Sequence, residues 1–335
     1  MEKNQQILLA ARPQAQVELS HFKWVEKDIE PPGESEFLVR AHYLSLDPYM
    51  RGRIDEAKSY AAKVELGAVM VGTVVGEVIV SHHEKFPVGS FVETHTGWQL
   101  YGKSNGAGVR LLPPKPVPLS AYLGAVGMPG VTAWIGLNEH GRAEPGQTVV
   151  ISAASGAVGS VAGQLAKLKG CRVVGIAGGQ AKCDYVVNEL GFDACIDYKK
   201  NEALTLSERL AVACPKGVDV YFDNVGGPIL NAVLEVMNPF SRIALCGLIA
   251  GYEDPQRLAV TNFRSFLVNR IQLRGFICSD HRPLWKPALE ALAQGVASGA
   301  IRYRETVAQG LQAAPGAFIG MLRGENFGKQ LVKLI

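Results

Sequence analysis

Residues 149–163, VVISAASGAVGSVAG, constrain the fold more than any other segment of this chain. An apolar, β-branched run ends at Ser152, turns through small residues, and continues with a helical pattern. This order predicts a strand, a tight turn and a helix N-terminus, where free backbone N–H groups and the helix dipole can bind a diphosphate. The spacing is A-x-x-G-x-x-G, with Ala153 in place of the first glycine, before Gly156 and Gly159. Because such turns also occur for packing alone, the motif needs support from the rest of the chain.

Composition limits the class of protein. The 335 residues favour two domains, and 47% hydrophobic with 19% charged residues indicates a globular chain. The net charge of +3 gives no reason to expect nucleic acid or an anionic membrane surface as a partner. Two charge-poor stretches, Val117–Asn138 and Pro145–Ala166, are broken by Gly, Pro or Ser, which predicts buried core and not membrane spans. No signal peptide is evident at the N-terminus, so we expect a cytoplasmic location.

The hydrophobic pattern changes along the chain. Residues 1 to about 125 hold short strand-like runs bounded by Gly, Pro or Asp, which predicts an antiparallel β-rich domain folded as a small barrel. The final stretch, Ile301–Ile335, again mixes turns and strands and could return to this first domain. The first-domain strands are predicted at Phe37–Leu44, Val69–Val80 and Ser90–Thr94.

After Pro129, strands alternate with helices, which predicts a doubly wound parallel sheet with helices on both faces, an α/β fold. The predicted strands are Thr148–Ile151, Arg172–Ala177, Cys195–Asp197, Val218–Asp223, Arg242–Leu245 and Gln272–Ile277. The predicted helices are Val158–Lys169, Lys182–Leu190, Glu202–Ala213, Ile229–Met237 and Leu284–Ala297.

The end of the second predicted strand indicates which dinucleotide binds. An NAD site places an Asp or Glu there to hold the ribose 2′-hydroxyl, but this chain has Gly178 and Gly179. The missing acid and the nearby Lys182 favour NADP, because a lysine can pair with the 2′-phosphate. Tyr198, after the third strand, could donate its hydroxyl to the same phosphate. Lys182 could instead be a solvated surface lysine.

Two further glycine-bearing turns follow later predicted strands, at 223–227 (DNVGG) and 246–249 (CGLI). Ligands of doubly wound sheets lie outside the carboxyl ends of the strands, which is where these turns are expected. Three such turns are much harder to attribute to packing than one.

At this point the sequence resembles a known family, the zinc-independent branch of the medium-chain dehydrogenase/reductase superfamily. More narrowly, it is similar to the prostaglandin reductase and leukotriene B4 12-hydroxydehydrogenase group, with its bacterial curcumin-reductase-like and alkenal/enone reductase relatives. The matching strings run nearly end to end and are LDPYMRGR (46–53), MPGVTAW (128–134), AASGAVGSVAGQLAKLKGCRVVGIAG (153–178), YFDNVGG (221–227), CGLIAGY (246–252) and GMLRGENFGKQLV (320–332).

The resemblance implies a GroES-like β-barrel catalytic domain at 1–126, a Rossmann NADP-binding domain at 127–300, and a C-terminal segment, 301–335, that returns to the catalytic domain. It also implies a cytosolic homodimer with NADPH as cofactor and a small-molecule enone or enal as substrate. The implied cofactor-binding residues are Met128, Thr132, Gly156, Ala157, Val158, Gly159, Lys182, Tyr198, Asn224, Cys246, Gly247, Leu248, Ile249, Tyr252, Phe276, Ile277, Cys278, Ser279 and Asn326.

The residues agree with the absence of zinc that the resemblance implies. Zinc alcohol dehydrogenases use cysteine and histidine ligands at the catalytic metal and a four-cysteine lobe, whereas this chain has no cysteine before Cys171 and no C-x-x-C pair. His82 and His83 fall in a polar, turn-like segment, and His95 and His140 are unaccompanied. We therefore expect no metal.

Two residues are candidates for catalysis. Reduction of an enone places charge on the carbonyl oxygen, so the site has to position two partners and offer that oxygen hydrogen bonds. Tyr49, within DPYMR, is the candidate from the first domain, although it could be a packed tyrosine behind Pro48. His281, in FICSDHRP, lies where some relatives carry a tyrosine, and it could donate a hydrogen bond or a proton or be a loop histidine in water.

Three functions remain open from the sequence. The first is NADPH-dependent reduction of the C=C bond in α,β-unsaturated aldehydes or ketones. The second is a quinone reductase of the neighbouring zinc-free branch, and the third is an NADPH-binding protein with little catalysis. The DPYMR and GENFGK strings favour the first.

Overall fold

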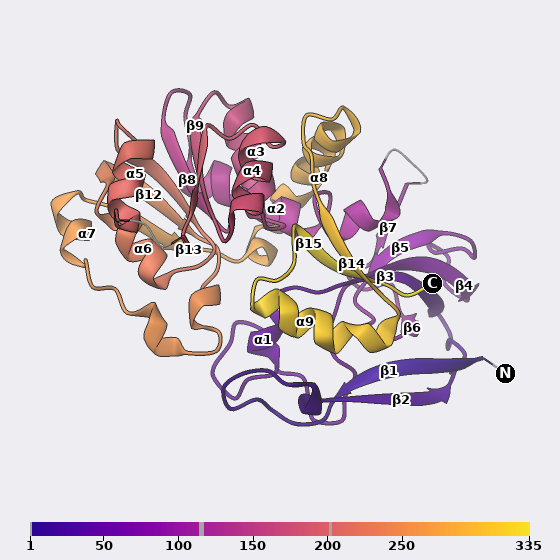
Figure 1. The fold of residues 1–335 in the computed structure, drawn as a ribbon. Coiled ribbons are helices and arrows are strands. Elements are labelled where there is room, and N and C mark those ends of the chain that lie inside the picture. The colour runs from indigo at the N-terminus through magenta and orange to yellow at the C-terminus, as the bar shows by residue number, and fades with distance from the viewer. Residues whose placement is uncertain (1, 114–116, 201–202) are drawn as a thin grey trace. The chain divides into compact units, whose positions relative to one another are not determined.

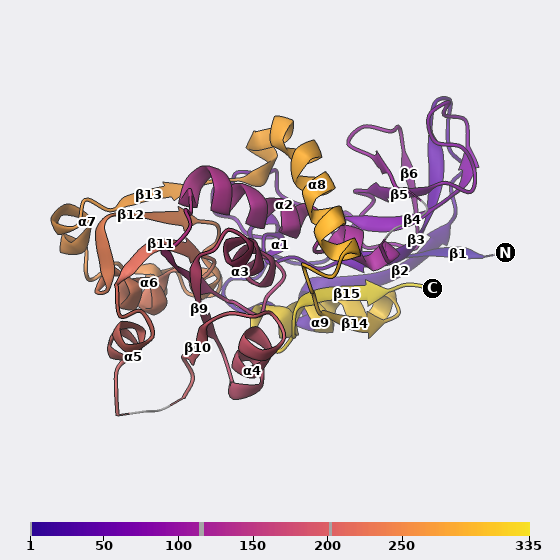
Figure 2. The same ribbon diagram turned by 90° about the horizontal axis from the view of Figure 1, so that it is seen from above.

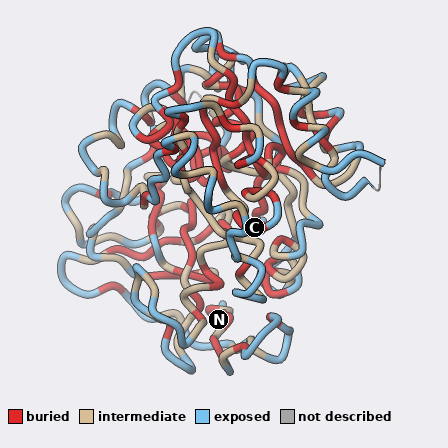
Figure 3. Tube along the Cα trace, turned by 90° about the vertical axis from the view of Figure 1, so that its left-hand side faces the viewer, coloured by how far each residue is buried: buried red, intermediate tan, exposed pale blue. Residues whose placement is uncertain are grey.

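The structure is a computed structural model that describes residues 2–113, 117–200 and 203–335. It divides into two compact units, one formed by Met1–Gly124 with Glu305–Ile335 and the other by Ala125–Arg304. Each unit has its own buried core, drawn in red in Figure 3. We call the first the outer unit, because it is formed by the two ends of the chain. We call the second the middle unit, because it is formed by the middle of the chain.

The middle unit is a doubly wound α/β fold built on one six-stranded sheet (Figure 1). The strand order is β10-β9-β8-β11-β12-β13, and every neighbouring pair is parallel. From β8 the chain builds outward in one direction and then crosses to β11 to build in the other, so the direction reverses between β8 and β11. In doubly wound sheets, ligands bind outside the carboxyl ends of the strands at such a reversal, so the ends of β8 and β11 are where a ligand is expected.

The boundaries agree closely with the predicted elements. The strands are β8 (Thr148–Ser152), β9 (Arg172–Ala177), β10 (Ala194–Asp197), β11 (Val218–Asp223), β12 (Met237–Leu245) and β13 (Gln272–Gly275). The α-helices are α2 (Met128–Ile135), α3 (Gly159–Leu168), α4 (Gln180–Asn188), α5 (Leu206–Ala213), α6 (Gly227–Leu234), α7 (Arg264–Val268) and α8 (Arg282–Ala297). Short turns of 3-10 or π helix are η3 (Gly136–Gly141), η4 (Ile249–Gly251), η5 (Pro255–Leu258) and η6 (Cys278–His281).

Local chemistry explains several of these boundaries. The hydroxyl of Thr205 accepts the backbone N–H of Glu208 at 3.3 Å, while the Glu208 carboxylate accepts that of Thr205 at 2.7 Å. This capping box starts α5 at Leu206 and not at the predicted Glu202, and residues 201–202 lie outside the described part of the chain. Helices α2, α3 and α8 lie side by side in Figure 2 and contact one another through α2.

The largest difference from the predicted boundaries in this unit lies between α6 and β12. The helix expected at Ile229–Met237 ends at Leu234, and Met237 already begins β12, five residues before the predicted strand. The extra strand is irregular: its pairing with β11 shifts register, and Phe240 has φ 62° directly after Pro239. A proline and a left-handed residue disguise a strand in the sequence pattern because neither fits a regular ladder.

The outer unit holds a two-stranded antiparallel sheet, β1-β2, and a seven-stranded sheet in the order β14-β15-β3-β4-β5-β7, with β6 paired to β3. Among the described residues the pairing runs from β14 to β7 without closing into a ring, so the β-rich domain predicted as a small barrel is built on an open mixed sheet. The strands are β1 (Lys3–Leu9), β2 (Phe22–Asp28), β3 (Phe37–Ser45), β4 (Val74–Ser81), β5 (Phe91–Thr94), β6 (Tyr101–Ser104), β7 (Arg110–Leu111), β14 (Glu305–Gln309) and β15 (Lys329–Lys333). The helices are α1 (Met50–Arg53) and α9 (Ala314–Leu322), with 3-10 turns η1 (Leu19–His21), η2 (Leu119–Leu123) and η7 (Leu311–Ala313).

The chain's last segment belongs to this sheet, because β15 pairs antiparallel with β3 and parallel with β14.

Close contact between strands accounts for one glycine of this sheet, Gly76 on β4. A Cβ on Gly76 would overlap the carbonyl oxygen of Arg40 on the paired strand, next to a register shift in β3.

Candidate active site

The carboxyl ends of the parallel strands gather most of the predicted cofactor-binding residues of the middle unit at one edge of its sheet. The segments after β8, β9, β10, β11, β12 and β13 all leave the sheet at this edge, because every strand runs in the same direction. The predicted residues in these segments are Gly156, Ala157, Val158, Gly159, Lys182, Tyr198, Asn224, Cys246, Gly247, Leu248, Ile249, Tyr252, Phe276, Ile277, Cys278 and Ser279.

The glycine turn after β8 leads directly into the N-terminus of α3, as the motif predicted. Ala153 opens the turn in the left-handed region, with φ 49°, and its carbonyl accepts the N–H of Gly156 at 2.9 Å. A Cβ on Gly159 would overlap that same carbonyl oxygen, so only glycine fits there. Gly156, Ala157 and Val158 are half-buried, which leaves their backbone accessible to a ligand. The arrangement fits a diphosphate at a helix N-terminus.

A third glycine in this segment serves packing. A Cβ on Gly163, one turn into α3, would overlap the ring of Phe192. Glycine here lets α3 approach the sheet layer closely, which is one of the roles of glycine in dinucleotide-binding folds.

Beneath the turn, the buried carboxylate of Asp223 organises the end of β11. One of its oxygens accepts the Tyr221 hydroxyl at 2.8 Å, the Ser152 hydroxyl at 3.2 Å and the N–H of Gly226 at 2.8 Å. Burial raises the pKa of Asp223, because the charged form loses water. The Ser152 hydroxyl also accepts the N–H of Asn224 at 2.9 Å, and its carbonyl accepts the Asn224 amide at 2.7 Å. The network therefore ties together the ends of β8 and β11 and the turn that follows β11.

The turn after β12 is tied to the turn after β11 through main-chain hydrogen bonds. The carbonyl of Asp223 accepts the N–H groups of Cys246 and Gly247 at 2.8 and 3.1 Å, and that of Asn224 accepts the N–H of Ile249 at 3.4 Å. A Cβ on Gly226 would lie 2.7 Å from the side chain of Leu248. The turns after β11 and β12 are thus held together by hydrogen bonds and close packing.

A basic corner lies after β9 and β10. A Cβ on Gly178 would lie 3.2 Å from the Tyr198 hydroxyl and 3.0 Å from Cε of Lys199, so glycine leaves room for both side chains. One carboxylate oxygen of Asp197 accepts the N–H groups of Gly179 at 2.8 Å and Lys199 at 3.0 Å, which fixes both loops. We call Gly178, Lys182, Tyr198 and Lys199 the basic corner.

Two lysines lie close enough at the basic corner for the charge of one to act on the other. Burial and the nearby positive charge of Lys199 lower the pKa of Lys182, which is the effect expected when like charges are held together. The sequence predicted Lys182 and Tyr198 but passed over Lys199. The signal for it was present in the string DYKK, directly after the third strand, but surface lysine pairs are too common to single it out.

The segments predicted to line the nicotinamide half come together within the middle unit. The hydroxyl of Thr132 donates to the carbonyl of Met128 at 2.8 Å on α2, and the same side chain hydrogen bonds with the thiol of Cys278. Burial raises the pKa of both Cys246 and Cys278. Cys278 lies close enough to Cys246 to raise the pKa of Cys246 further. Both thiols are therefore protonated and inert at neutral pH.

His281 contacts a second histidine. Its Nε2 lies 3.2 Å from Nε2 of His140, and the two rings meet edge to face. The His140 ring stacks on Phe276 with centroids 4.6 Å apart. Burial, assisted by Arg274, lowers the pKa of His140 to about 4, so this imidazole is neutral at physiological pH.

In the outer unit, Tyr49 caps α1 and packs half-buried against the hydrophobic core. Its loop is held by a buried ion pair, in which Nζ of Lys329 lies 3.1 Å from Asp47 and donates to the carbonyl of Leu46 at 2.6 Å. Burial lowers the pKa of Lys329, and the Asp47 charge opposes that shift. The LDPYM and GENFGK strings are therefore joined by their charged residues.

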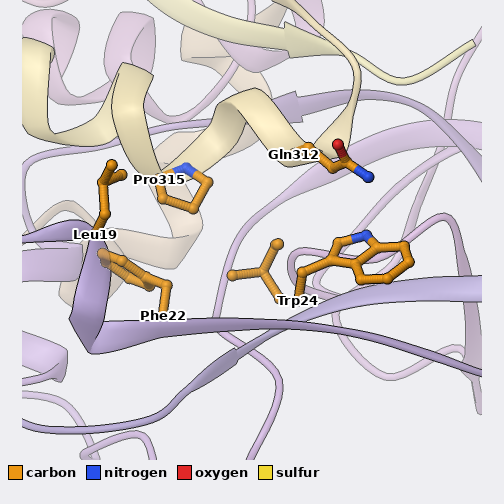
Figure 4. Close-up of a pocket in the computed structure, with 6 residues that line it drawn as sticks. Leu19, Phe22, Trp24, Gln312 and Pro315 are labelled. Carbon is orange, nitrogen blue, oxygen red and sulfur yellow. The ribbon is translucent and has the colours of Figure 1, made fainter.

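Asn326, the other predicted site residue of this unit, donates from its side chain to the carbonyl of Gly328 at 2.8 Å. The unit also has a hollow of about 350 Å³, where Leu19, Phe22 and Trp24 face Gln312 and Pro315 (Figure 4). None of the residues predicted for catalysis or cofactor binding lines it.

Comparison with known proteins decides the family. Residues 5–112 match the family described as the N-terminal domain of oxidoreductase, and residues 157–294 match zinc-binding dehydrogenase. The NADPH-dependent curcumin reductase of Escherichia coli is 42% identical over 99% of this chain and 97% of its own length. The chain belongs to the medium-chain dehydrogenase/reductase superfamily. Within it, prostaglandin reductase 1 of Rattus norvegicus is 41% identical over 94% of each chain.

Solved structures of the superfamily share the fold. CurA of Vibrio vulnificus in complex with NADPH is 45% identical, with a TM-score of 0.92 over 99% of both chains. The Escherichia coli quinone oxidoreductase complexed with NADPH has a TM-score of 0.79 over 98% of this chain and 99% of its own, but is only 19% identical, so it shows the shared fold alone.

The zinc in the description of one matching family does not fit this chain. Within residues 2–113, 117–200 and 203–335, no three His, Cys, Asp or Glu side chains come together in a way that could hold a metal ion. We therefore derive no step through zinc. In the same ranges, no helix is both long and apolar enough to cross a membrane.

Proposed function

We propose that this chain is an NADPH-dependent reductase of the C=C bond in α,β-unsaturated aldehydes and ketones. The basic corner carries the cofactor part of the proposal. Two neighbouring lysines and one hydroxyl suit a 2′-phosphate, and Gly178 and Gly179 stand after β9 where an NAD site has an Asp or Glu. The nearby Asp197 carboxylate is engaged by the N–H groups of Gly179 and Lys199. The reaction class is supported by relatives of about 40% identity named curcumin reductase, prostaglandin reductase and 2-alkenal reductase.

Each part of the site has a separate task in this proposal. The turn at Gly156–Gly159 holds the diphosphate, and Lys182, Tyr198 and Lys199 hold the 2′-phosphate. Asn224 holds the ribose and diphosphate from the turn after β11. The nicotinamide half lies along the segments 246–252 and 276–279, supported by Met128 and Thr132, and Asn326 closes over the cofactor.

The substrate requires a hydrogen-bond donor at its carbonyl oxygen. When bound, NADPH supplies the hydride that adds to the β-carbon, which moves negative charge to that oxygen. Tyr49 and His281 are the proposed donors, since a preorganised O–H or N–H at a developing oxyanion stabilises the transition state. Proton transfer to the α-carbon then completes the reduction. We expect Tyr49→Phe to lower kcat by roughly 10- to 100-fold, with little change in the KM for NADPH.

The deciding experiment measures NADPH oxidation with three acceptors, a 2-alkenal, an aryl enone and a quinone, and identifies the products by mass spectrometry. We expect saturated aldehyde and ketone products and a much lower rate with the quinone. Fast turnover of the quinone alone would support the quinone oxidoreductase alternative. NADPH binding without turnover of any acceptor would support a binding protein with little catalysis.

We also propose a cytoplasmic homodimer. The six cysteines are free thiols, which is the usage expected in a reducing compartment. Strand β13 is exposed along its whole length at the edge of a parallel sheet, including Leu273, and a bare edge of this kind favours pairing with a second chain. Sedimentation equilibrium should give twice the chain mass of 36.0 kDa. A single-chain mass at micromolar concentration would rule out the dimer.

A further inference from the structure

We propose that His140 is a positioning residue for His281: it donates a hydrogen bond from Nε2 to Nε2 of His281 and so holds His281 as the neutral Nδ1–H tautomer. The inference rests in part on the proposed function, because it determines which atom of His281 can serve as the donor at the substrate oxygen.

The contact between the two rings leaves few choices. At 3.2 Å, the two Nε2 atoms are within hydrogen-bonding distance, so one of them carries a hydrogen and the other accepts it. If both carried a hydrogen, the two N–H groups would point at each other. Each imidazole therefore determines the tautomer of its partner.

The surroundings of His140 decide the direction of the hydrogen bond. His140 is only 5% exposed, and its Nδ1 finds no hydrogen-bond partner among the described residues. If His140 accepted from His281, its own hydrogen would sit on Nδ1 as a buried, unpaired N–H. Buried N–H groups without a partner are rarer in proteins than acceptors without one, so the hydrogen belongs on Nε2 of His140.

His140 also stays neutral, which the proposed hydrogen bond requires. Burial is the main cause of its lowered pKa, and the nearby side chains of Arg274, His281 and Arg142 act in the same direction. These three are the charged or titratable groups that act on the ring, and none of them favours the imidazolium.

The fold holds the donor ring rigidly. His140 lies on η3, a π-helical turn directly after α2, and its ring stacks on Phe276 at 4.6 Å with 29° between the planes. A Cβ on Gly136, at the start of η3, would lie 2.6 Å from the Phe276 ring, so the turn and the ring are closely packed. π-helical turns of this kind are frequent at functional sites.

The acceptor is held from the opposite side. His281 ends η6, and the indole N–H of Trp285 on α8 donates to the carbonyl of Cys278 in the same turn at 2.9 Å. With Nε2 of His281 engaged by His140, only Nδ1 remains for a substrate. The sequence places His281 near the nicotinamide segment, and the structure adds which of its nitrogens is available.

The test is side-chain ¹⁵N NMR of the cofactor-free protein at pH 7.5, which does not depend on activity. We expect His140 with its hydrogen on Nε2 and His281 with its hydrogen on Nδ1. In His140→Phe, which keeps a ring on Phe276 but removes the donor, His281 should shift towards the Nε2–H tautomer. His82→Phe, a change in an exposed histidine of the outer unit, should leave the His281 signals unchanged.

Kinetics provide the second readout. With an enone, His140→Phe should lower kcat about tenfold at unchanged KM for NADPH, and His140→Gln, whose amide can still donate, should recover most of the rate. An Nε2–H tautomer of His281 in the wild type, or an unchanged Nδ1–H tautomer of His281 in His140→Phe, would falsify the proposal. If the tautomers are as expected but no enone is reduced, the positioning stands and the proposed function fails.

Discussion

The two units differ in how their charged side chains are arranged: one buries a pair of opposite charges, and the other holds two like charges near each other. In the outer unit, Lys329 and Asp47 bring opposite charges together inside the core, where Lys329 is 3% exposed. In the middle unit, the basic corner holds Lys182 and Lys199 near each other, and burial together with the charge of Lys199 lowers the pKa of Lys182. The first arrangement pairs opposite charges within the chain, whereas the second suits the phosphate that we propose binds there. Paired charges therefore belong to the buried structure of this molecule, and neighbouring like charges support the proposed ligand site.

The largest expected effect comes from breaking the buried pair. Lys329→Met leaves the Asp47 carboxylate buried without its cation and should lower the free energy of unfolding by about 3–5 kcal/mol. Denaturant titration measures this loss. Lys333→Met, on the exposed end of the same strand, is the matched control and should change the stability by less than about 0.5 kcal/mol.

A double substitution tests the buried pair of Asp47 and Lys329 more strictly. Asp47→Asn combined with Lys329→Met removes both charges and should recover a clear part of the lost stability. If the single Lys329→Met variant is as stable as the wild type, the pair is not structural and the contrast between the two units fails.

Removing the first cation of the basic corner should affect binding and not folding. Lys182→Ala should raise the Kd for NADPH by roughly 10- to 100-fold, because a charge-assisted hydrogen bond to phosphate contributes about 1.5–3 kcal/mol. The Kd for NADH should change by less than about twofold. Calorimetric titration with both nucleotides measures the two values, and an equal loss for NADH would mean that Lys182 does not contact the 2′-phosphate.

Lys199→Ala tests the cation that sequence reading missed. We expect the Kd for NADPH to rise about tenfold, equivalent to about 1.4 kcal/mol, with NADH again almost unaffected. Lys200→Ala provides the control, since it removes the same charge one residue further along an exposed segment. Equal effects of the two substitutions would show that general surface charge, and not the geometry of the corner, attracts the nucleotide.

The smallest effect concerns a group that is buried and uncharged. The pKa of His140 is lowered from 6.5 to about 4, so the unfolded chain binds more protons between these values. Stability should therefore fall as the pH drops from about 6.5 to about 4, by about 1 kcal/mol once solvent screening is allowed for. The free energy of unfolding of the wild type and of His140→Phe, measured across this pH range, tests this, and it should fall less steeply with pH in the variant. The same pH dependence in both proteins would show that His140 titrates normally.

The sequence was sufficient where local patterns carry the information. The turn from Ala153 to Gly159, the alternation of strands and helices after Pro129, and the missing acid at Gly178 each follow from a few adjacent residues. The strands Arg172–Ala177 and Val218–Asp223 were predicted to the residue. Patterns of this kind survive in the fold because local propensity and tertiary packing agree there.

Long-range contacts could not be predicted in the same way. His140 and His281 are 141 positions apart, and Lys329 is 283 positions from the Leu46 carbonyl that it contacts. No spacing rule joins residues at such separations, because the fold alone brings them together. The early start of β12 was missed for a local reason, since Pro239 interrupts the strand pattern. The roles of Tyr49 and His281 stay predictions.

The left-handed backbone of Ala153 has a consequence for affinity. A residue with a Cβ pays about 1 kcal/mol or more to occupy that region, and the surrounding turn enforces it in the protein without a ligand. Glycine at this position would avoid the strain but would also make the unfolded chain more flexible. In the proposed diphosphate-binding role of this turn, the conformational cost of shaping it is then met at folding, and the turn would be in its binding shape before a nucleotide arrives.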